Sequence, residues 1–160
     1  PEGARGKPEH DPIACIACAA CANVCPPNAI QMLIEADKGQ TTWSINFGRC
    51  IFCGRCEEVC PTHAIVLGKE FELAVMNKED LEERCTYDMA RCSECGEYYA
   101  TVKQVDYATR ILSQLPGDLE AQQAAALTGV CPKCKQKADA YRNKHRDELV
   151  GGKRKMEAKR

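Results

Sequence analysis

The chain has 160 residues, a formal net charge of −1 and 28% charged residues, which suits one domain or two small metal-held domains. The near-neutral charge argues against a general nucleic-acid or membrane-surface binder, and no apolar stretch is long enough to span a bilayer. Aromatic residues make up only 6%, whereas the 13 cysteines approach the level of a cysteine-scaffolded chain. A small apolar core and many thiols predict that metal binding is part of folding.

Residues 1–12 are rich in proline, glycine and charge, which predicts an extended arm without helix or strand. The sequence begins at Pro1 and not at an initiator methionine, which leaves open a native segment before it. Because no apolar run typical of a secretory signal appears, we expect a reducing compartment in which the thiols remain available as ligands.

Two cysteine runs of identical spacing follow, Cys15–Pro26 and Cys50–Pro61. Each run is C-x2-C-x2-C-x3-C-P, the pattern of bacterial two-cluster iron–sulfur proteins, in which the fourth cysteine ligates the other cluster. A disulfide framework or a pair of zinc knuckles is disfavoured, because there is no secretory signal and zinc sites seldom use this spacing. The expected ligands are Cys15, Cys18, Cys21 and Cys60 for one [4Fe–4S] cluster (cluster 1), and Cys50, Cys53, Cys56 and Cys25 for the other (cluster 2).

The similarity between the runs extends to their apolar neighbours, which match at an offset of 35 residues. The matched pairs are Ile16 and Ile51, Val24 and Val59, Ala29 and Ala64, and Ile30 and Ile65. This repeat predicts an α+β fold, with a duplicated, pseudo-two-fold symmetric ferredoxin domain over residues 13–76. Between the copies, 31–35 and 42–47 predict a hairpin around Gly39, since glycine accepts the positive φ that such turns need.

The segment after the repeat predicts one strand and one short helix. Residues 71–76 alternate weakly and predict a strand at the domain edge. Asn77 is a candidate cap for an acidic helix that ends near Arg84, within a linker helix region over 77–90.

Three side chains within or after the repeat are assigned no role as metal ligands. Trp43 is the only tryptophan, and we expect it to pack over a cluster. Cys85 has no partner by spacing and is expected to be a small buried hydrophobic residue. His63 is assigned no function, because each cluster already has four thiolates.

A second metal site is predicted over residues 91–136 by two C-x2-C knuckles, formed by Cys92, Cys95, Cys131 and Cys134. Four thiolates make a closed tetrahedral site, for which zinc is the first candidate. A single iron in a rubredoxin-like site is the alternative, because sulfur ligation alone does not separate the two metals. The domain is expected to be a four-cysteine, rubredoxin-like ribbon with an inserted pair of helices.

The inserted helices have recognisable starts. Thr101 to Leu115 carries one apolar stripe, and Thr101 with Gln104 resembles a capping box. A second helix is expected from Asp118 as N-cap to about Gly129. The charged tail over 137–160 has nine Lys and Arg against four Asp and Glu, which predicts a solvated segment and not a nucleic-acid patch.

The sequence predicts an electron carrier with no catalytic site of its own. Fully cysteine-ligated clusters leave no iron open to a substrate. The chain shows no Ser/His/Asp set, no paired carboxylates in a plausible cleft and no Gly-rich nucleotide loop. Each cluster would transfer one electron at a time.

Three stretches carry a family resemblance: Arg5–Glu9, Cys50–Pro61 and Glu72–Val75. Together with the later knuckles they resemble the polyferredoxin subunits of formate hydrogenlyase, seen also as component H of hydrogenase-4. The ferredoxin part is similar to the two-cluster subunit of respiratory complex I. The resemblance runs from Arg5 to Cys134, and the knuckle pair with its helical insertion favours the hydrogenase branch.

The resemblance implies a membrane-associated complex, with this chain peripheral on the cytoplasmic face of the inner membrane. Electrons would pass between another ferredoxin-type subunit and the small subunit of a [NiFe] hydrogenase, beside its large subunit and integral membrane subunits. The alternatives are an iron–sulfur subunit of a complex I-like or other respiratory complex, a free low-potential ferredoxin, and a redox-sensing nucleic-acid binder. The knuckle domain argues against the free ferredoxin, and the lack of a basic, aromatic face argues against nucleic acid as a partner.

Overall fold

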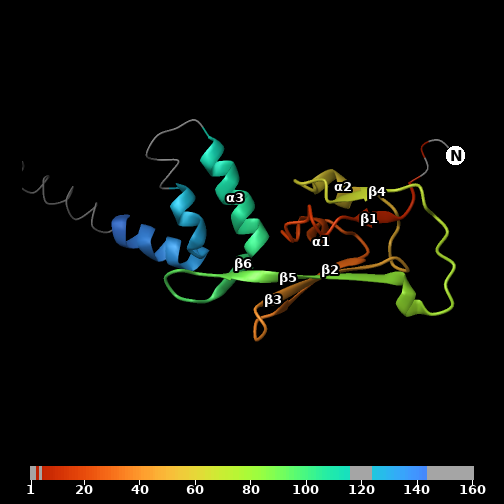
Figure 1. Cartoon of the computed structure of the whole chain (residues 1–160), viewed down its shortest axis with the longest axis horizontal. Helices are drawn as coiled ribbons and strands as arrows, with labels where there is room; N and C mark the ends of the chain where they lie inside the picture. The colour runs from red at the N-terminus through yellow and green to blue at the C-terminus, as the bar shows by residue number, and fades with distance from the viewer. Residues whose placement is uncertain (1–2, 4, 116–123, 144–160) are drawn as a thin grey trace, which may run out of the picture.

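The structure, a computed structural model, describes residues 3, 5–115 and 124–143 of the chain. These residues form a mixed α/β fold with two antiparallel sheets (Figure 1). The first sheet pairs β1 (Pro8–His10) with β4 (Ile65–Leu67). The second has the strand order β2-β3-β5-β6, from β2 (Ile30–Glu35), β3 (Gln40–Asn46), β5 (Glu82–Arg91) and β6 (Tyr98–Thr101). The helical segments are α1 (Ala20–Asn23), α2 (Arg55–Val59), α3 (Val102–Gln114), the 3-10 turns η1 (Lys78–Leu81) and η2 (Leu127–Gly129), and helices over 124–126 and 132–143.

The hairpin between the cysteine runs is confirmed. Strands β2 and β3 pair from Ile30 opposite Ile45 to Glu35 opposite Gln40. Gly39 in the turn has φ of +67°, which favours glycine. Glycine is also required there by space, because a Cβ atom at this position would collide with the Tyr98 ring.

The extended arm predicted over residues 1–12 is wrong for its last part. Pro8–His10 form β1, which pairs antiparallel with β4 so that Glu9 lies opposite Val66. A segment with two prolines nearby can still form a strand at a sheet edge, since proline lacks only the outward N–H there. Pairing with β4, which is distant in sequence, is what stabilises β1 as a strand.

The prediction for residues 71–84 is also wrong. Residues 71–76 form no strand, and Phe71 and Met76 are exposed. Asn77 precedes only the 3-10 turn η1 and makes no side-chain cap bond. Residues 82–91 are not part of a linker helix but form β5, which pairs with β3 from Asn46 opposite Glu82 to Gln40 opposite Asp88. Pairing along this length of strand outweighs the weak local helix signal.

The long strand β5 joins the two parts of the molecule. Its first part pairs with β3, and its end pairs with β6, which leads directly into α3 (Figure 1). The helix over residues 101–115 is confirmed, and Thr101 caps it by accepting a hydrogen bond from the Gln104 N–H at 3.2 Å. Asp118 and residues 144–160, for which a helix start and most of a charged tail were predicted, lie outside the described residues.

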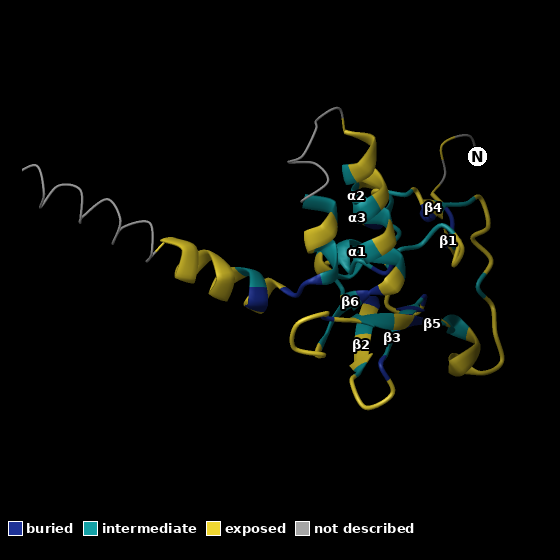
Figure 2. Cartoon of the chain, turned by 60° about the vertical axis from the view of Figure 1, so that its left-hand side comes forward, coloured by how far each residue is buried: buried dark blue, intermediate teal, exposed yellow. Residues whose placement is uncertain are grey.

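The apolar core lies between the two sheets and the cysteine loops. Strand β3 contributes alternate residues, and its buried face carries Trp43 and Ile45, each 1% exposed. Ile65 from β4 and Tyr87 from β5 pack against them. A separate, smaller core surrounds the knuckles, and the helix over 132–143 is largely exposed (Figure 2). None of the helices in the described part of the chain has the length and apolarity needed to cross a membrane.

Candidate metal centres

The structure gathers the eight cysteines of the two runs around two partly enclosed cavities of similar size. The first cavity is lined by Cys15, Cys18, Cys21 and Cys60. The second is lined by Cys25, Cys50, Cys53 and Cys56. Each cavity therefore takes three cysteines from one run and the fourth from the other, which is the grouping expected from the spacing.

Both loops have the same unusual backbone conformation. Three pairs of residues at an offset of 35 have positive φ: Ala17 and Phe52 (50° and 53°), Ala19 and Gly54 (64° and 81°), and Asn28 and His63 (51° and 53°). Positive φ is uncommon for residues other than glycine and raises the backbone energy. Such strain at matched positions indicates that both loops are shaped around the same kind of group.

Matched backbone N–H groups donate to the cysteine sulfurs. The bonds are Ala17 N to Cys15 Sγ (3.3 Å) and Phe52 N to Cys50 Sγ (3.4 Å), then Ala29 N to Cys25 Sγ (3.3 Å) and Ala64 N to Cys60 Sγ (3.2 Å). Such donors stabilise negative charge on sulfur. At Cys60, burial raises the thiol pKa, but hydrogen bonds from the Thr62, Ile65 and Ala64 N–H groups outweigh it and hold the pKa below its ordinary value.

At other cavity cysteines burial dominates. It raises the thiol pKa of Cys15, Cys21 and Cys50, and raises that of Cys56 to about 11. A buried thiolate therefore needs a compensating cation. Iron supplies that charge, so the chemistry of these donors fits an iron–sulfur cluster.

The wall of the first cavity contains a buried donor without a partner. Trp43 lines this cavity, and its indole N–H has no hydrogen-bond partner within bonding distance. Burial raises the pKa of the Cys21 thiol, and the nearby Trp43 indole N–H partly opposes that effect. Buried N–H groups are nearly always satisfied, so an acceptor in the cavity is expected. A cluster sulfur fits this position.

Two further side chains were missed in the sequence: His10, which lines this cavity, and Tyr87, which lies behind it in the core. Tyr87 is buried in the core against which Cys15 packs, and its hydroxyl lies 3.5 Å from His10 Nε2. Burial raises the pKa of the Cys15 thiol, and the Tyr87 hydroxyl partly opposes that effect. The His10 ring stacks on Trp43 with centroids 3.8 Å apart, and burial lowers its pKa. Alternation of buried and exposed residues along 82–91 would have placed Cys85 and Tyr87 on one face, but that segment was assigned to a helix. Cys85 lies half-buried opposite Trp43 and lines neither cavity.

The knuckles bring their four sulfurs together as expected. The Sγ atoms of Cys92, Cys95, Cys131 and Cys134 all lie within 4.8 Å of one another, and those of Cys95 and Cys131 are 3.7 Å apart. Tetrahedral ligation at about 2.3 Å from a metal requires sulfurs about 3.8 Å apart. The Cys131 N–H donates to Cys92 Sγ at 3.2 Å, and backbone N–H groups lower the pKa of the Cys92 thiol to about 6. The donor set fits a closed metal site.

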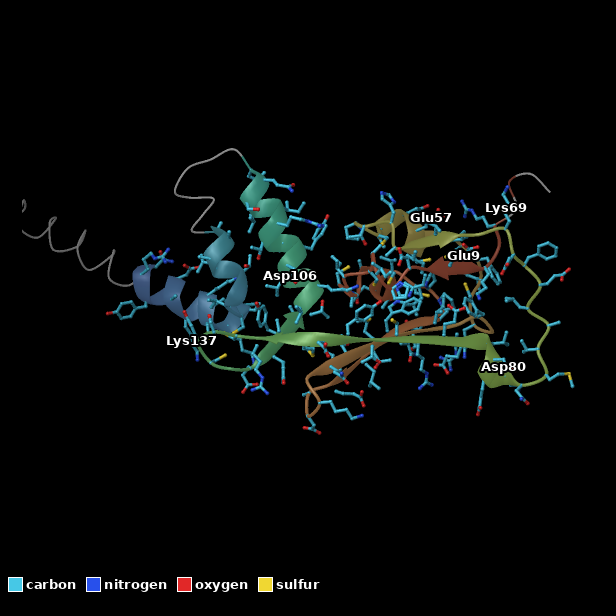
Figure 3. The ribbon with its side chains drawn as sticks, in the orientation of Figure 1. Glu9, Glu57, Lys69, Asp80, Asp106 and Lys137 are labelled. Carbon is cyan, nitrogen blue, oxygen red and sulfur yellow. The ribbon has the colours of Figure 1, made fainter. Side chains whose placement is uncertain are left out.

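Side chains at the start of α3 bond the backbone of the loop at the beginning of the first cysteine run. Thr101 Oγ1 donates to the Ile16 carbonyl at 2.6 Å, and Lys103 Nζ donates to the Pro12 and Ile13 carbonyls at 2.6 and 2.8 Å. A groove of about 530 Å³ remains between this loop and α3, and Asp106 lies on its helix side (Figure 3). Long-range contacts of this kind have no local sequence signal.

Comparison with known proteins decides the family. Residues 14–64 match the 4Fe-4S dicluster domain family. Over 132 residues the chain is 46% identical to formate hydrogenlyase subunit 6 of Escherichia coli (strain K12), covering 82% of this chain and 73% of the relative. The chain belongs to the formate hydrogenlyase subunit 6 family. The resemblance predicted from the sequence is thereby confirmed, and members of this family are iron–sulfur electron-transfer subunits and not catalysts.

One solved structure is similar to part of this chain. It is the membrane-bound sulfane sulfur reductase, an archaeal respiratory membrane complex, with 31% identity and a TM-score of 0.38. The match covers 49% of this chain and 42% of the solved chain.

Proposed function

We propose that this chain carries single electrons through two [4Fe–4S] clusters inside a formate hydrogenlyase-like, membrane-associated [NiFe] hydrogenase complex. The observation that carries the proposal is the pair of cavities, each lined by three cysteines of one run and one of the other. The dicluster domain match over residues 14–64 covers both runs and supports it.

The ligand sets follow from the cavities. Cys15, Cys18, Cys21 and Cys60 would hold cluster 1, and Cys50, Cys53, Cys56 and Cys25 would hold cluster 2. The clusters supply one-electron redox chemistry when bound. The protein binds them through thiolates, stabilises the sulfur charge with the paired N–H donors, and excludes water with Trp43 and Ile65. Matched loops at one offset support an origin by duplication.

Cys92, Cys95, Cys131 and Cys134 would hold one structural zinc, with a single iron as the alternative. This site stabilises the region after β5 and has no open coordination position. We divide the chain into the ferredoxin domain, completed by β1 and by the first part of β5, and the knuckle domain over 91–136.

The partners proposed are another ferredoxin-type subunit, the [NiFe] hydrogenase small and large subunits, and the integral membrane subunits of the same complex. The name of the E. coli relative supports a hydrogenlyase complex. The location proposed is the cytoplasmic face of the membrane, as a peripheral subunit.

Anaerobic metal and sulfide analysis with EPR of the reduced protein tests the cofactor proposal. About eight iron, eight sulfide and one zinc per chain, with spin coupling between two reduced clusters, is expected. A ninth iron without zinc would assign the knuckles to a rubredoxin-like centre. Iron far below eight would overturn the electron-transfer proposal.

Affinity capture tests the placement in a complex. The tagged chain is expressed in its native host under anaerobic conditions and captured after mild detergent extraction. Recovery of a [NiFe] hydrogenase small subunit is expected. Recovery of complex I-like subunits without a hydrogenase would instead support the respiratory alternative.

A further inference from the structure

The surroundings of the two cavities differ in their side-chain donors, although they share a matched set of backbone donors. In each cavity one N–H bond reaches the first cysteine of the run, and another reaches the exchanged cysteine from the residue four positions later, with lengths of 3.2–3.4 Å. These matched bonds do not distinguish the clusters, so the side chains are the donors to compare.

Three side chains around the first cavity can donate to sulfur. The Trp43 indole N–H is buried, unpaired and in the cavity wall. Tyr87, on β5, is buried in the core against which Cys15 packs, and its hydroxyl opposes the pKa-raising effect of burial on the Cys15 thiol. Thr62 Oγ1 lies 3.7 Å from Cys60 Sγ. Two of the three come from the sheet that this chain adds beside the cysteine loops.

The second cavity has no equivalent among the described residues. Within the chain that the structure describes, the sulfurs of Cys25, Cys50 and Cys56 receive backbone donors, and none of the four cysteine sulfurs of this cavity receives a side-chain donor. Pro27 occupies the position that matches Thr62 in the repeat and has no donor to offer. The asymmetry is therefore built into the sequence as well as the sheet.

Nearby cations do not cancel this asymmetry. Lys103 contacts the backbone of the first loop through the Pro12 and Ile13 carbonyls, and Arg5 Nη1 contacts that of the second through the Cys53 carbonyl at 2.6 Å. Each loop thus has one cation bonded to its carbonyl oxygens. Arg55 also lines the second cavity, but its guanidinium is paired with the Glu58 carboxylate at 3.1 Å. The side-chain donors remain as the main difference.

We propose that Trp43 and Tyr87 are positioning residues that give cluster 1 a higher reduction potential than cluster 2. When the protein holds a single electron, that electron then resides mainly on cluster 1. The inference builds on the proposed function. Hydrogen bonds to cluster sulfur stabilise the reduced, more negative state and raise the reduction potential. An electron from a ferredoxin-class donor that enters at cluster 2 then passes to cluster 1, which oxidises the former and reduces the latter.

The test is an EPR-monitored redox titration of the holoprotein and of the variants Trp43→Phe, Tyr87→Phe and the double variant. Phenylalanine keeps an aromatic ring and removes the donor group. In the double variant the equilibrium constant for reducing cluster 1 is expected to fall about tenfold, which is about 59 mV for one electron. The potential of cluster 2 is expected to stay unchanged. The cluster 1 signal is identified as the one lost or altered by Cys18→Ser.

Tyr99→Phe is the matched control, because it removes a hydroxyl that donates to the Thr128 carbonyl in the knuckle domain. Neither potential should change in it. If Trp43→Phe does not assemble its clusters, a double variant of Tyr87→Phe and Thr62→Val replaces it in the titration. Unchanged potentials in variants with full iron and sulfide, or equal shifts at both clusters, would overturn the inference, and so would a wild-type cluster 2 that is reduced first. A wild-type protein without two clusters would instead overturn the proposed function.

Discussion

At the scale of the residue, the fourth cysteine of each run decides how the two loops depend on each other. Cys25 lines the cavity of the second run, and Cys60 lines that of the first. Both receive an N–H bond from the residue four positions later, after a proline that redirects the chain. A change at either position should therefore act on the cluster that is distant in sequence.

Cys25→Ser tests this dependence. Because Cys25 completes the second cavity, the variant should damage cluster 2 and leave the EPR signal of cluster 1 in place. Cys85→Ser is the control, since Cys85 lines neither cavity and should leave both signals unchanged. Loss of cluster 1 in the Cys25→Ser protein would show that the ligand exchange is wrong.

At the scale of the element, the start of helix α3 holds the C-terminal part against the loop of the first cysteine run. Thr101 is 3% exposed and its hydroxyl has two roles, since it caps α3 and donates to Ile16. Strand β5 carries these elements because its end pairs with β6. The C-terminal region thus supports the first loop directly.

Thr101→Val should lower the free energy of unfolding by about 2 kcal/mol, because it keeps the side-chain volume but leaves the Ile16 carbonyl and Gln104 N–H unpaired. Denaturant unfolding of the holoprotein measures the change. Thr42→Val is the control: its hydroxyl bonds Thr86 on the exposed face of the sheet, and the effect there should stay within about 0.5 kcal/mol. Equal effects of the two substitutions would contradict the double role of Thr101.

Cys92→Ser should remove the knuckle metal and leave both clusters. The four knuckle sulfurs form their own group, and none of them lines either cluster cavity. Zinc and iron are counted per chain in the purified variant, and about one zinc should disappear with about eight iron retained. Loss of the EPR signals as well would mean that the knuckles and the clusters fold as one unit.

At the scale of the whole molecule, the metals take the place of a larger apolar core. Among the residues that the structure describes, the main core cluster has eight buried members, and cavity cysteines surround it. A core this small stabilises a chain only weakly without metals or disulfides. The clusters should therefore be required for the native fold of the ferredoxin domain.

Anaerobic removal of iron by a chelator should unfold that domain. Hydrogen exchange of the β2 and β3 amides should become fast, because cluster binding and folding are linked. The Cys92→Ser protein, which retains its clusters, provides the comparison for loss of the knuckle metal alone. Native-like protection of these strands after complete iron loss would contradict the prediction.

The sequence by itself determined the two sets of four cysteines, the β2–β3 hairpin and the capped helix α3. Spacing, a repeat, a turn glycine and a capping threonine are local signals, so one sequence suffices to find them. The same local signals misassigned residues 8–10 and 82–91, because a strand exists only through its partner.

Tertiary structure decided the rest. Pairing of β5 with β3 brings Tyr87 into the core with Trp43, which lines the first cavity. The β6–α3 connection brings Thr101 and Lys103 to the loop that begins there. These contacts join residues far apart in the sequence, as in the separation of 85 positions between Ile16 and Thr101. Such distant contacts depend on strand pairing and not on local pattern, which is why the positions of Trp43 and Tyr87 in one core emerge only in the folded molecule.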